Sequence, residues 1–192
     1  MSKALNVAVC QVNPTLGNFQ KNIDIISKNY KYAVEKGADL VVFPEMSITG
    51  YPPQDLLNNK EFISQNISSL NELTKSTTIP CILGYVDFED NKKFNAAAVC
   101  QDGEIVYKYH KIHLPNYDVF DERRYFHSGD SIGIFDLKVN NSDYKIALQI
   151  CEDLWEDEYE RKISEEIIEN NPDLIINISA SPFAKDRKND RM

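Results

Sequence analysis

The feature that most constrains the fold is the alternation of strand-like and helix-like patterns along the chain. Residues 5–12 alternate between apolar and polar side chains, which is typical of a half-buried strand, and apolar residues then recur at helical spacing from Ile23 to Val34. Gly37 indicates the end of that helix, and the apolar run at residues 39–43 predicts a buried strand. This alternation predicts an α/β fold built in layers.

The rest of the chain continues the same pattern. The further predicted elements are a helix at residues 56–73, a strand at 81–85, two strands at 95–100 and 105–109, two strands at 132–137 and 144–150, a short helix at about 159–169 and a strand at 174–178. Asp102 and Gly103 predict a hairpin turn between the strands that flank them. Residues 110–130 show little periodicity and are too long for an ordinary connection, so we expect a functional loop there.

Composition and charge exclude several classes of function. Of the 192 residues, 42% are hydrophobic and 27% charged, which is ordinary for a soluble domain. The net charge of -9 is a poor basis for holding nucleic acid phosphates or anionic lipid, so neither nucleic acid nor a membrane is an expected partner. No run has membrane-spanning length and the N-terminus has no pattern of a secretory signal peptide, so we expect a cytoplasmic protein.

The four cysteines are expected to be free thiols. Cys10, Cys81, Cys100 and Cys151 form no CxxC pair and have no His nearby at metal-ligand spacing, so the sequence predicts neither a metal site nor a disulfide framework. The first three lie in apolar, strand-like runs, where a cysteine acts as a small buried hydrophobic residue. Cys151 differs because it comes directly after a predicted strand.

Three reactive side chains follow the ends of predicted strands. They are Glu45, Lys111 and Cys151, and in an open α/β sheet such positions commonly carry the functional site. Acyl transfer needs a nucleophile, a base and a positive group where negative charge develops, and these three side chains supply them. Taken singly, each has an ordinary alternative: a solvated carboxylate, a surface charge and a buried core thiol.

The segments around these residues resemble a known family. They read FPEMSITGYPP at residues 43–53, HKIHLPNY at 110–117 and ICEDLW at 150–155, and they are similar to the three signature blocks of the nitrilase superfamily. Their form is closest to the glutaminase domain of glutamine-dependent NAD synthetases. The resemblance implies Glu45 as the base, Lys111 as the stabiliser of the oxyanion and Cys151 as the nucleophile. It also implies a four-layer α-β-β-α sandwich, which we expect to be incomplete at the C-terminus.

The same resemblance implies a substrate and the residues that hold it. The substrate would be glutamine, hydrolysed to glutamate and ammonia through a cysteine thioester without a cofactor or a metal. The residues implied to line its pocket are Tyr117, Glu152, Trp155, Ser181 and Arg187. Glu122 occupies the place of a second carboxylate near the lysine, but it could equally be a structural partner of Arg123 or Arg124.

Relatives of this type imply partners outside the chain. Residues 1–192 would form a truncated glutaminase domain that supplies ammonia to a C-terminal synthetase domain, which uses ATP and magnesium to convert nicotinic acid adenine dinucleotide into NAD. No glycine-rich phosphate loop of the SGGxDS type occurs here, so that domain is expected to be absent. A homo-oligomer is expected, with the helix at 159–169 contributing to its interface. The alternatives are a stand-alone amidase for another small amide and an inactive fragment.

Overall fold

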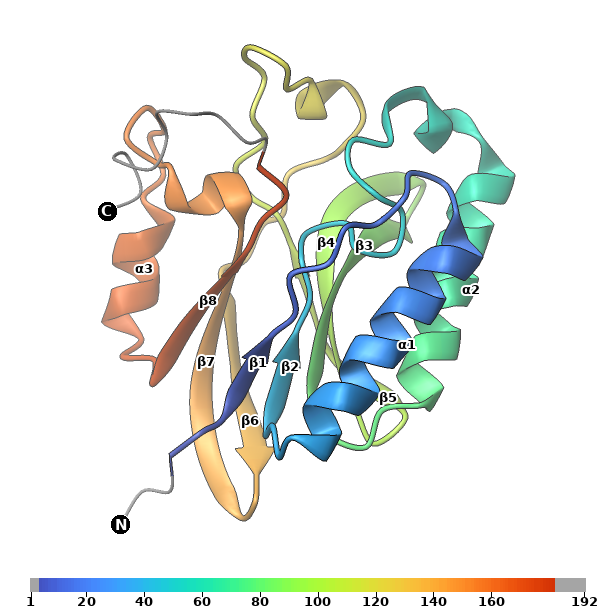
Figure 1. The fold of residues 1–192 in the computed structure, drawn as a ribbon. Coiled ribbons are helices and arrows are strands. Elements are labelled where there is room, and N and C mark those ends of the chain that lie inside the picture. Colours follow the sequence, from blue (N-terminus) through green and yellow to red (C-terminus); the bar gives the residue numbers. More distant parts are fainter. Residues whose placement is uncertain (1–3, 182–192) are drawn as a thin grey trace.

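The computed structural model describes residues 4–181 as an α/β fold of four layers (Figure 1). Helices α1 and α2 cover one face of a first sheet, a second sheet packs against its other face, and α3 covers the far side of the second sheet. The α-β-β-α order implied by the resemblance is therefore confirmed. The elements are β1 Val7–Val9, α1 Phe19–Glu35, β2 Leu40–Val42, η1 Gln54–Asn58, α2 Lys60–Lys75, β3 Cys81–Glu89, β4 Lys92–Gln101, β5 Glu104–His110, η2 Glu122–Arg124, β6 Gly133–Val139, β7 Ser142–Ile150, η3 Cys151–Leu154, α3 Ile163–Glu169 and β8 Leu174–Ile178.

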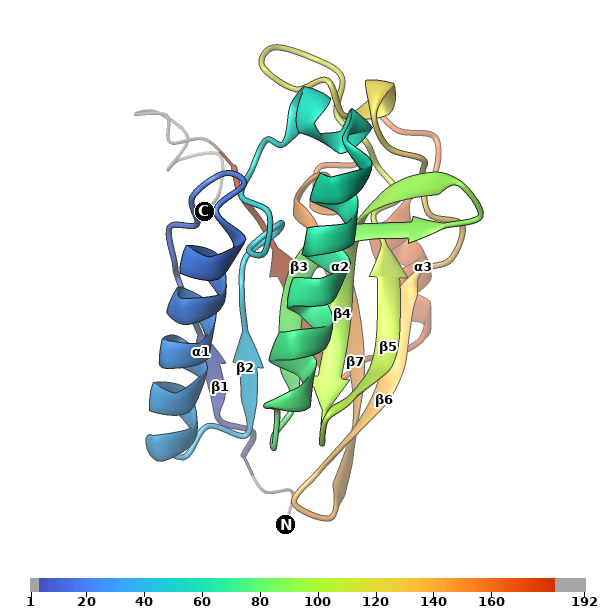
Figure 2. The same ribbon diagram turned by 90° about the vertical axis from the view of Figure 1, so that its right-hand side faces the viewer.

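The direction of the strands brings several strand ends to the same side of the molecule. Within the described residues, the first sheet has the order β1-β2-β3-β4-β5 and the second the order β6-β7-β8. β2 pairs in parallel with β3, and β4 runs antiparallel to both β3 and β5, so β5 points the same way as β2. The C-terminal ends of β2, β5 and β7 lie at the upper side of Figures 1 and 2. The loops that follow these ends are not hydrogen-bonded into the sheets, so their side chains can build a site.

Two apolar cores hold the layers together. The core beneath α1 and α2 contains Ile26, Leu70 and Leu83, whereas the core between the sheets contains Ile82 and Leu148. Ile82 and Leu83 are neighbours in β3 but belong to different cores, because successive residues of a strand point to opposite faces. Strands buried on both faces read as continuous apolar runs, which is why β2 and β3 were predictable.

The second predicted helix is divided in two. The sequence pattern predicted one helix from residue 56, but η1 ends at Asn58 and α2 begins at Lys60. The side chain of Asn59 accepts hydrogen bonds from the backbone N–H groups of Glu61 at 2.8 Å and Phe62 at 3.4 Å. A capping asparagine starts a new helix at this point, so the single-helix prediction was wrong at its beginning.

The last helix is also shorter than predicted. α3 begins at Ile163, whereas the pattern predicted a start near Tyr159. Tyr159 is held elsewhere, because its hydroxyl donates to Glu152 at 3.1 Å and its ring stacks on His113 with centroids 3.9 Å apart. These two contacts, one with nearby Glu152 and one with His113 far away in the sequence, override the local helical pattern.

Strand boundaries differ from the prediction in both directions. β1 covers Val7–Val9 rather than residues 5–12, and β3 and β4 extend further than predicted, into a hairpin that was not predicted. Asp90 and Asn91 form its turn with φ values of 50° and 61°. A two-residue turn with both φ values positive suits hairpins, and Asp and Asn tolerate that conformation.

All four cysteines are free, as predicted. Among residues 4–181, no helix is long and apolar enough to cross a membrane.

Candidate active site

Glu45 lies in a tight turn that packs directly onto β3. The turn follows β2, and Glu45 is 1% exposed. Gly84 of β3 makes this packing possible, because a Cβ atom there would lie 2.7 Å from Cα of Glu45 and closer still to the backbone of Pro44 and Met46. The carbonyl of Gly84 also accepts a hydrogen bond from the hydroxyl of Ser47 at 3.2 Å. Gly84 therefore sets the position of Glu45, and the sequence analysis did not identify it.

Lys111 lies between two buried carboxylates. Its Nζ donates to Oε1 of Glu45 at 2.9 Å and to Oε1 of Glu122 at 3.0 Å, and the three side chains are 0%, 1% and 5% exposed. Burial opposes the charge of Lys111, but Glu45 and Glu122 outweigh it and raise the pKa of Lys111 well above its ordinary value. Lys111 is therefore a fixed cation and not a proton acceptor.

Glu122 is bound to Lys111 rather than to its neighbouring arginines. Arg123 donates through Nε to the carbonyl of Leu114, and Arg124 pairs with Asp121. Burial raises the pKa of Glu122, the nearby charge of Glu45 adds to this effect, and Lys111 opposes it. Of the two alternatives left open by the sequence, the geometry matches the second carboxylate.

Asn95 also joins the two carboxylates. Its Nδ2 donates to Oε1 of Glu45 at 2.7 Å and to Oε2 of Glu122 at 3.3 Å. Tyr51 adds a hydrogen bond from its hydroxyl to Glu122 at 3.0 Å. The sequence analysis missed Asn95, although an asparagine at the start of a buried strand of alanines was a usable signal, because buried polar groups need partners.

Cys151 is the first residue of η3, directly after β7, and its backbone conformation is unusual for a residue with a side chain. Its φ is 45°, a region that costs about 1–3 kcal/mol for residues other than glycine and that often occurs at functional sites. Its Sγ lies 3.3 Å from the hydroxyl oxygens of both Ser179 and Ser181. The next N–H group in that segment, Ala180 N, donates to Oε2 of Glu45 at 2.9 Å, so the segment after β8 links Cys151 to Glu45.

The surroundings of Cys151 keep its thiol protonated. Burial and the charge of Glu45 raise its pKa, while Lys111 and the hydroxyls of Ser179 and Ser181 lower it, and the result is a pKa of about 11. At neutral pH Cys151 is therefore a thiol rather than a thiolate. Glu45 is the carboxylate whose charge this thiol senses most strongly.

A second group of predicted residues lines a pocket of about 690 Å³ beside this site. Glu152 follows Cys151 and is 4% exposed, and its carboxylate accepts hydrogen bonds from the hydroxyls of Tyr117 at 2.9 Å and Tyr159 at 3.1 Å. Trp155 lies on the wall of the same pocket. The structure thus brings together Tyr117, Glu152 and Trp155, places Ser181 beside Cys151, and adds Tyr159, which the sequence analysis missed. Arg187 lies outside the described residues.

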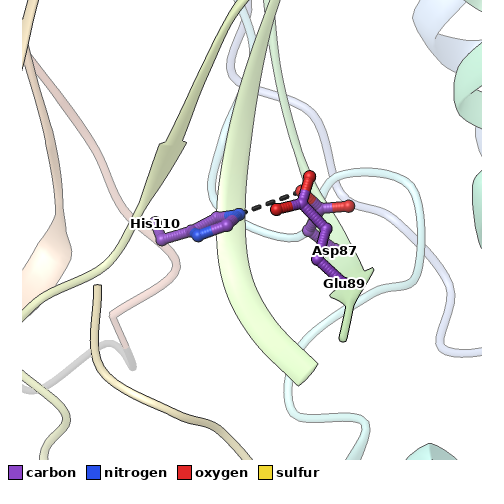
Figure 3. A group of neighbouring side chains, drawn as sticks. All are labelled: Asp87, Glu89 and His110. Carbon is purple, nitrogen blue, oxygen red and sulfur yellow. Dashed lines mark hydrogen bonds and ion pairs between the residues drawn. The ribbon is translucent and has the colours of Figure 1, made fainter. Parts of the chain in front are cut away.

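One group of side chains among residues 4–181 has the spacing of metal ligands. Asp87, Glu89 and His110 offer ligand atoms within 4.8 Å of one another on the outer face of β3 and β5 (Figure 3). The ligand atoms already have partners, because Lys108 donates to Asp87 at 3.1 Å and to Glu89 at 2.8 Å, and Nε2 of His110 lies 2.9 Å from Asp87. A cation would have to displace Lys108, so we assign no metal to it.

Comparison with solved structures supports the fold. The structure of glutamine-dependent NAD+ synthetase from Acinetobacter baumannii in complex with adenosine diphosphate superposes with a TM-score of 0.90 at 30% identity, covering 99% of this chain and 35% of that one. An amidase from Nesterenkonia superposes with a TM-score of 0.79 at 19% identity, covering 96% of this chain and 68% of the amidase. At that identity the second similarity concerns the fold alone.

Comparison of sequences gives the family. The glutamine-dependent NAD(+) synthetase of Thermotoga maritima is 41% identical over 184 residues, covering 94% of this chain and 31% of the relative. The corresponding enzyme of Synechocystis is 36% identical, covering 93% of this chain and 34% of the relative. The chain thus spans about a third of the length of these relatives. Residues 6–186 match the model of the carbon-nitrogen hydrolase family. With this match, and with the fold described above, the chain belongs to the carbon-nitrogen hydrolase family.

Proposed function

We propose that the chain hydrolyses the side-chain amide of glutamine to glutamate and ammonia, with Cys151 as nucleophile, Glu45 as base and Lys111 as stabiliser of the oxyanion. The observation that carries this proposal is the joint burial of a carboxylate and an ammonium, 2.9 Å apart, beside a thiol that cannot ionise alone at neutral pH. Three of the similar proteins, from Thermotoga maritima, Synechocystis and Acinetobacter baumannii, are named as glutamine-dependent enzymes, which supports glutamine as the amide.

The first half of the reaction forms a thioester. The Glu45 carboxylate takes the thiol proton while Sγ of Cys151 bonds to the amide carbon, and the carbonyl oxygen becomes an oxyanion. Lys111 and the backbone N–H of Glu152 stabilise this charge, and each well-placed donor contributes about 3–4 kcal/mol in comparable sites. The carbon–nitrogen bond then breaks, and protonated Glu45 gives its proton to the leaving nitrogen, which departs as ammonia.

The second half returns the enzyme to its starting state. Glu45 takes a proton from water, whose oxygen attacks the thioester carbon, and the carbon–sulfur bond breaks. Glu45 then returns the proton to the Cys151 sulfur, and glutamate leaves. Glu122 holds Lys111 in place throughout, because it accepts a hydrogen bond from the ammonium. Asn95 holds Glu45, because its amide donates to the carboxylate.

The pocket around Glu152 fits the amino-acid part of the substrate. A buried carboxylate, fixed by Tyr117 and Tyr159, suits an α-ammonium group. Trp155 and Ser181 would also line the part of the pocket that holds the amino-acid group, and Arg187 would bind the α-carboxylate through its planar guanidinium. In the longer protein, ammonia would pass to a synthetase domain for the ATP-dependent amidation of nicotinic acid adenine dinucleotide.

The test is the release of ammonia from glutamine, asparagine and acetamide by the purified chain and its variants. Cys151→Ala should reduce glutamine hydrolysis to the background rate with an unchanged circular dichroism spectrum, because no thioester can form. Cys10→Ala is the matched control and should keep the rate within about 2-fold, since Cys10 is a partly buried residue that packs against the core beneath α1 and α2. Retained activity in Cys151→Ala would rule out the nucleophile, and hydrolysis of acetamide in preference to glutamine would point to another amidase.

A further inference from the structure

Asp153 is a buried carboxylate that the proposed chemistry does not use. Its side chain is fully buried, and each of its oxygens accepts two hydrogen bonds. Oδ1 accepts from the backbone N–H groups of Ile112 at 3.1 Å and His113 at 2.8 Å. Oδ2 accepts from the backbone N–H of Ile150 at 2.9 Å and from the hydroxyl of Tyr109 at 2.7 Å. A carboxylate with two to three such donors is a strong and directional acceptor.

These four donors flank the two reactive side chains that come from different sheets. Ile150 directly precedes Cys151, whereas Tyr109 precedes Lys111 by two residues, and Ile112 and His113 follow it. The two segments are separated by about 40 residues, and Asp153 is bonded to both of them. Its own backbone carbonyl accepts a hydrogen bond from Gln149 at 3.3 Å, which further ties the turn to β7.

We propose that Asp153 is a positioning residue that fixes the Cys151 turn relative to the Lys111 segment. It need not touch the substrate or the reacting atoms. The residue before Cys151 and the two residues after Lys111 donate to the same carboxylate, so this one group links the backbone segments that carry the thiol and the ammonium. This inference rests on the proposed function for its effect on turnover, but its effect on Cys151 can be measured without glutamine.

The chemistry of the four bonds explains why a carboxylate is required. An ionised Asp has two acceptor oxygens, whereas the isosteric Asn has one oxygen and an NH2 group that only donates. In Asp153→Asn, the NH2 group would face either the N–H groups of Ile112 and His113 or that of Ile150. Those buried donors would then lose their acceptor, and the two segments would separate to relieve the contact.

The experiment measures two properties of Asp153→Asn in the complete chain. The first is the kcat and KM of glutamine hydrolysis, where we expect kcat to fall about 100-fold and KM to stay within about 3-fold, because a shift of about 1 Å in a reacting group has an effect of this size. The second is the rate of alkylation of Cys151 by iodoacetamide as a function of pH. Its midpoint should move to higher pH, because displacement of Lys111 removes a positive charge that favours the thiolate.

Two further variants separate positioning from stability. Tyr109→Phe removes only one of the four donors, so it should lower kcat about 5- to 10-fold and move the alkylation midpoint in the same direction, even if Asp153→Asn does not fold. Asp87→Asn is the matched control, because it also removes a buried carboxylate with charged partners, but on the outer face of the first sheet. It should lower the Tm and leave the alkylation profile unchanged.

The outcomes distinguish this inference from the proposed function. A folded Asp153→Asn chain with kcat within 3-fold of the wild type and an unchanged alkylation midpoint would overturn it, as would a Tyr109→Phe chain with neither property changed. If the wild type releases no ammonia from glutamine, the proposed function fails, but a shifted alkylation midpoint in Asp153→Asn would still support the positioning role.

Discussion

Two lysines three residues apart carry nearly the same ion pairs in different surroundings. Lys111 lies 2.9 and 3.0 Å from Glu45 and Glu122, and Lys108 lies 3.1 and 2.8 Å from Asp87 and Glu89. The side chain of Lys111 is fully buried, whereas that of Lys108 is 38% exposed. Since water screens a pair of charges far more than a protein interior does, equal distances give unequal interactions. Burial of the lysine therefore distinguishes the Lys111 cluster from the Lys108 cluster.

The chain path explains why the two clusters differ. Lys108 lies within β5 and its side chain points to the outer face, near α2, where it meets Asp87 and Glu89 of β3. Lys111 comes after the end of β5, and its backbone N–H donates to the carbonyl of Asn95 at 2.9 Å. Its side chain therefore enters the buried region at the strand ends.

The largest expected effect comes from removing the ammonium of each lysine. Lys111→Met should reduce glutamine hydrolysis at least about 100-fold and lower the free energy of unfolding by about 3–5 kcal/mol, because two carboxylates lose a buried partner. Lys108→Met should change the free energy of unfolding by about 1 kcal/mol or less and leave the rate within about 2-fold, because Lys108 and Glu89 are exposed to water and buried Asp87 keeps its contact with His110. Urea unfolding and ammonia release measure both. Equal losses in the two variants would remove the distinction drawn from burial.

A second effect concerns the pKa of the Cys151 thiol, which is about 11. The charge of Glu45 raises this pKa and that of Lys111 lowers it. Glu45→Gln should therefore move the pH midpoint of iodoacetamide alkylation down, and Lys111→Met should move it up. Lys108→Met is the control and should leave the midpoint in place. A midpoint that responded to Lys108 as strongly as to Lys111 would mean that the two clusters are not separate.

The smallest effect is a difference in the sign of the pH dependence of stability. Burial raises the pKa of Asp87, but hydrogen bonds from His110 and Lys108 outweigh burial and bring the pKa to about 2. Its contribution is therefore present above the ordinary pKa of about 4 and is lost as pH falls through about 2. Burial raises the pKa of Glu122, so its charged form costs stability as pH rises above its ordinary value.

The two carboxylates can be separated by variants. Asp87→Asn should flatten the loss of stability between about pH 4 and pH 2, whereas Glu122→Gln should flatten the fall in stability as pH rises above about 4.5. Urea unfolding at a series of pH values tests both signs. If both substitutions changed the pH dependence of stability in the same direction, the opposite pKa shifts given for Asp87 and Glu122 would be wrong.

The sequence predicted those parts of the molecule that depend on local pattern. β8 was predicted with the observed bounds. The strand ends before Glu45 and Cys151 were located because apolar runs mark buried strands, and the end before Lys111 was located from the strand pattern of residues 105–109. Glu45 and Lys111 are in contact in the structure, although the roles of all three residues remain predictions.

Other parts depend on partners far away in the sequence. Asn95 contacts Glu45 across 50 residues, and Asp153 contacts Ile112 across 41. Gly84 is needed only because the Glu45 turn lies against it. No periodicity encodes such contacts, so these residues appeared only in the structure. The helix before Ile163 was predicted too long for the same reason, since the ring of Tyr159 stacks on that of His113.

The hydrogen bond from Ala180 to Glu45 has a consequence for biosynthesis. It spans 135 residues, so Oε2 of Glu45 gains this donor only after almost all of the described chain has left the ribosome. A nascent chain that has already formed β1 to β5 would carry Glu45 with Lys111 but without this anchor. Formation of the first sheet is thus not enough to complete the surroundings of Glu45, which also require the segment after β8.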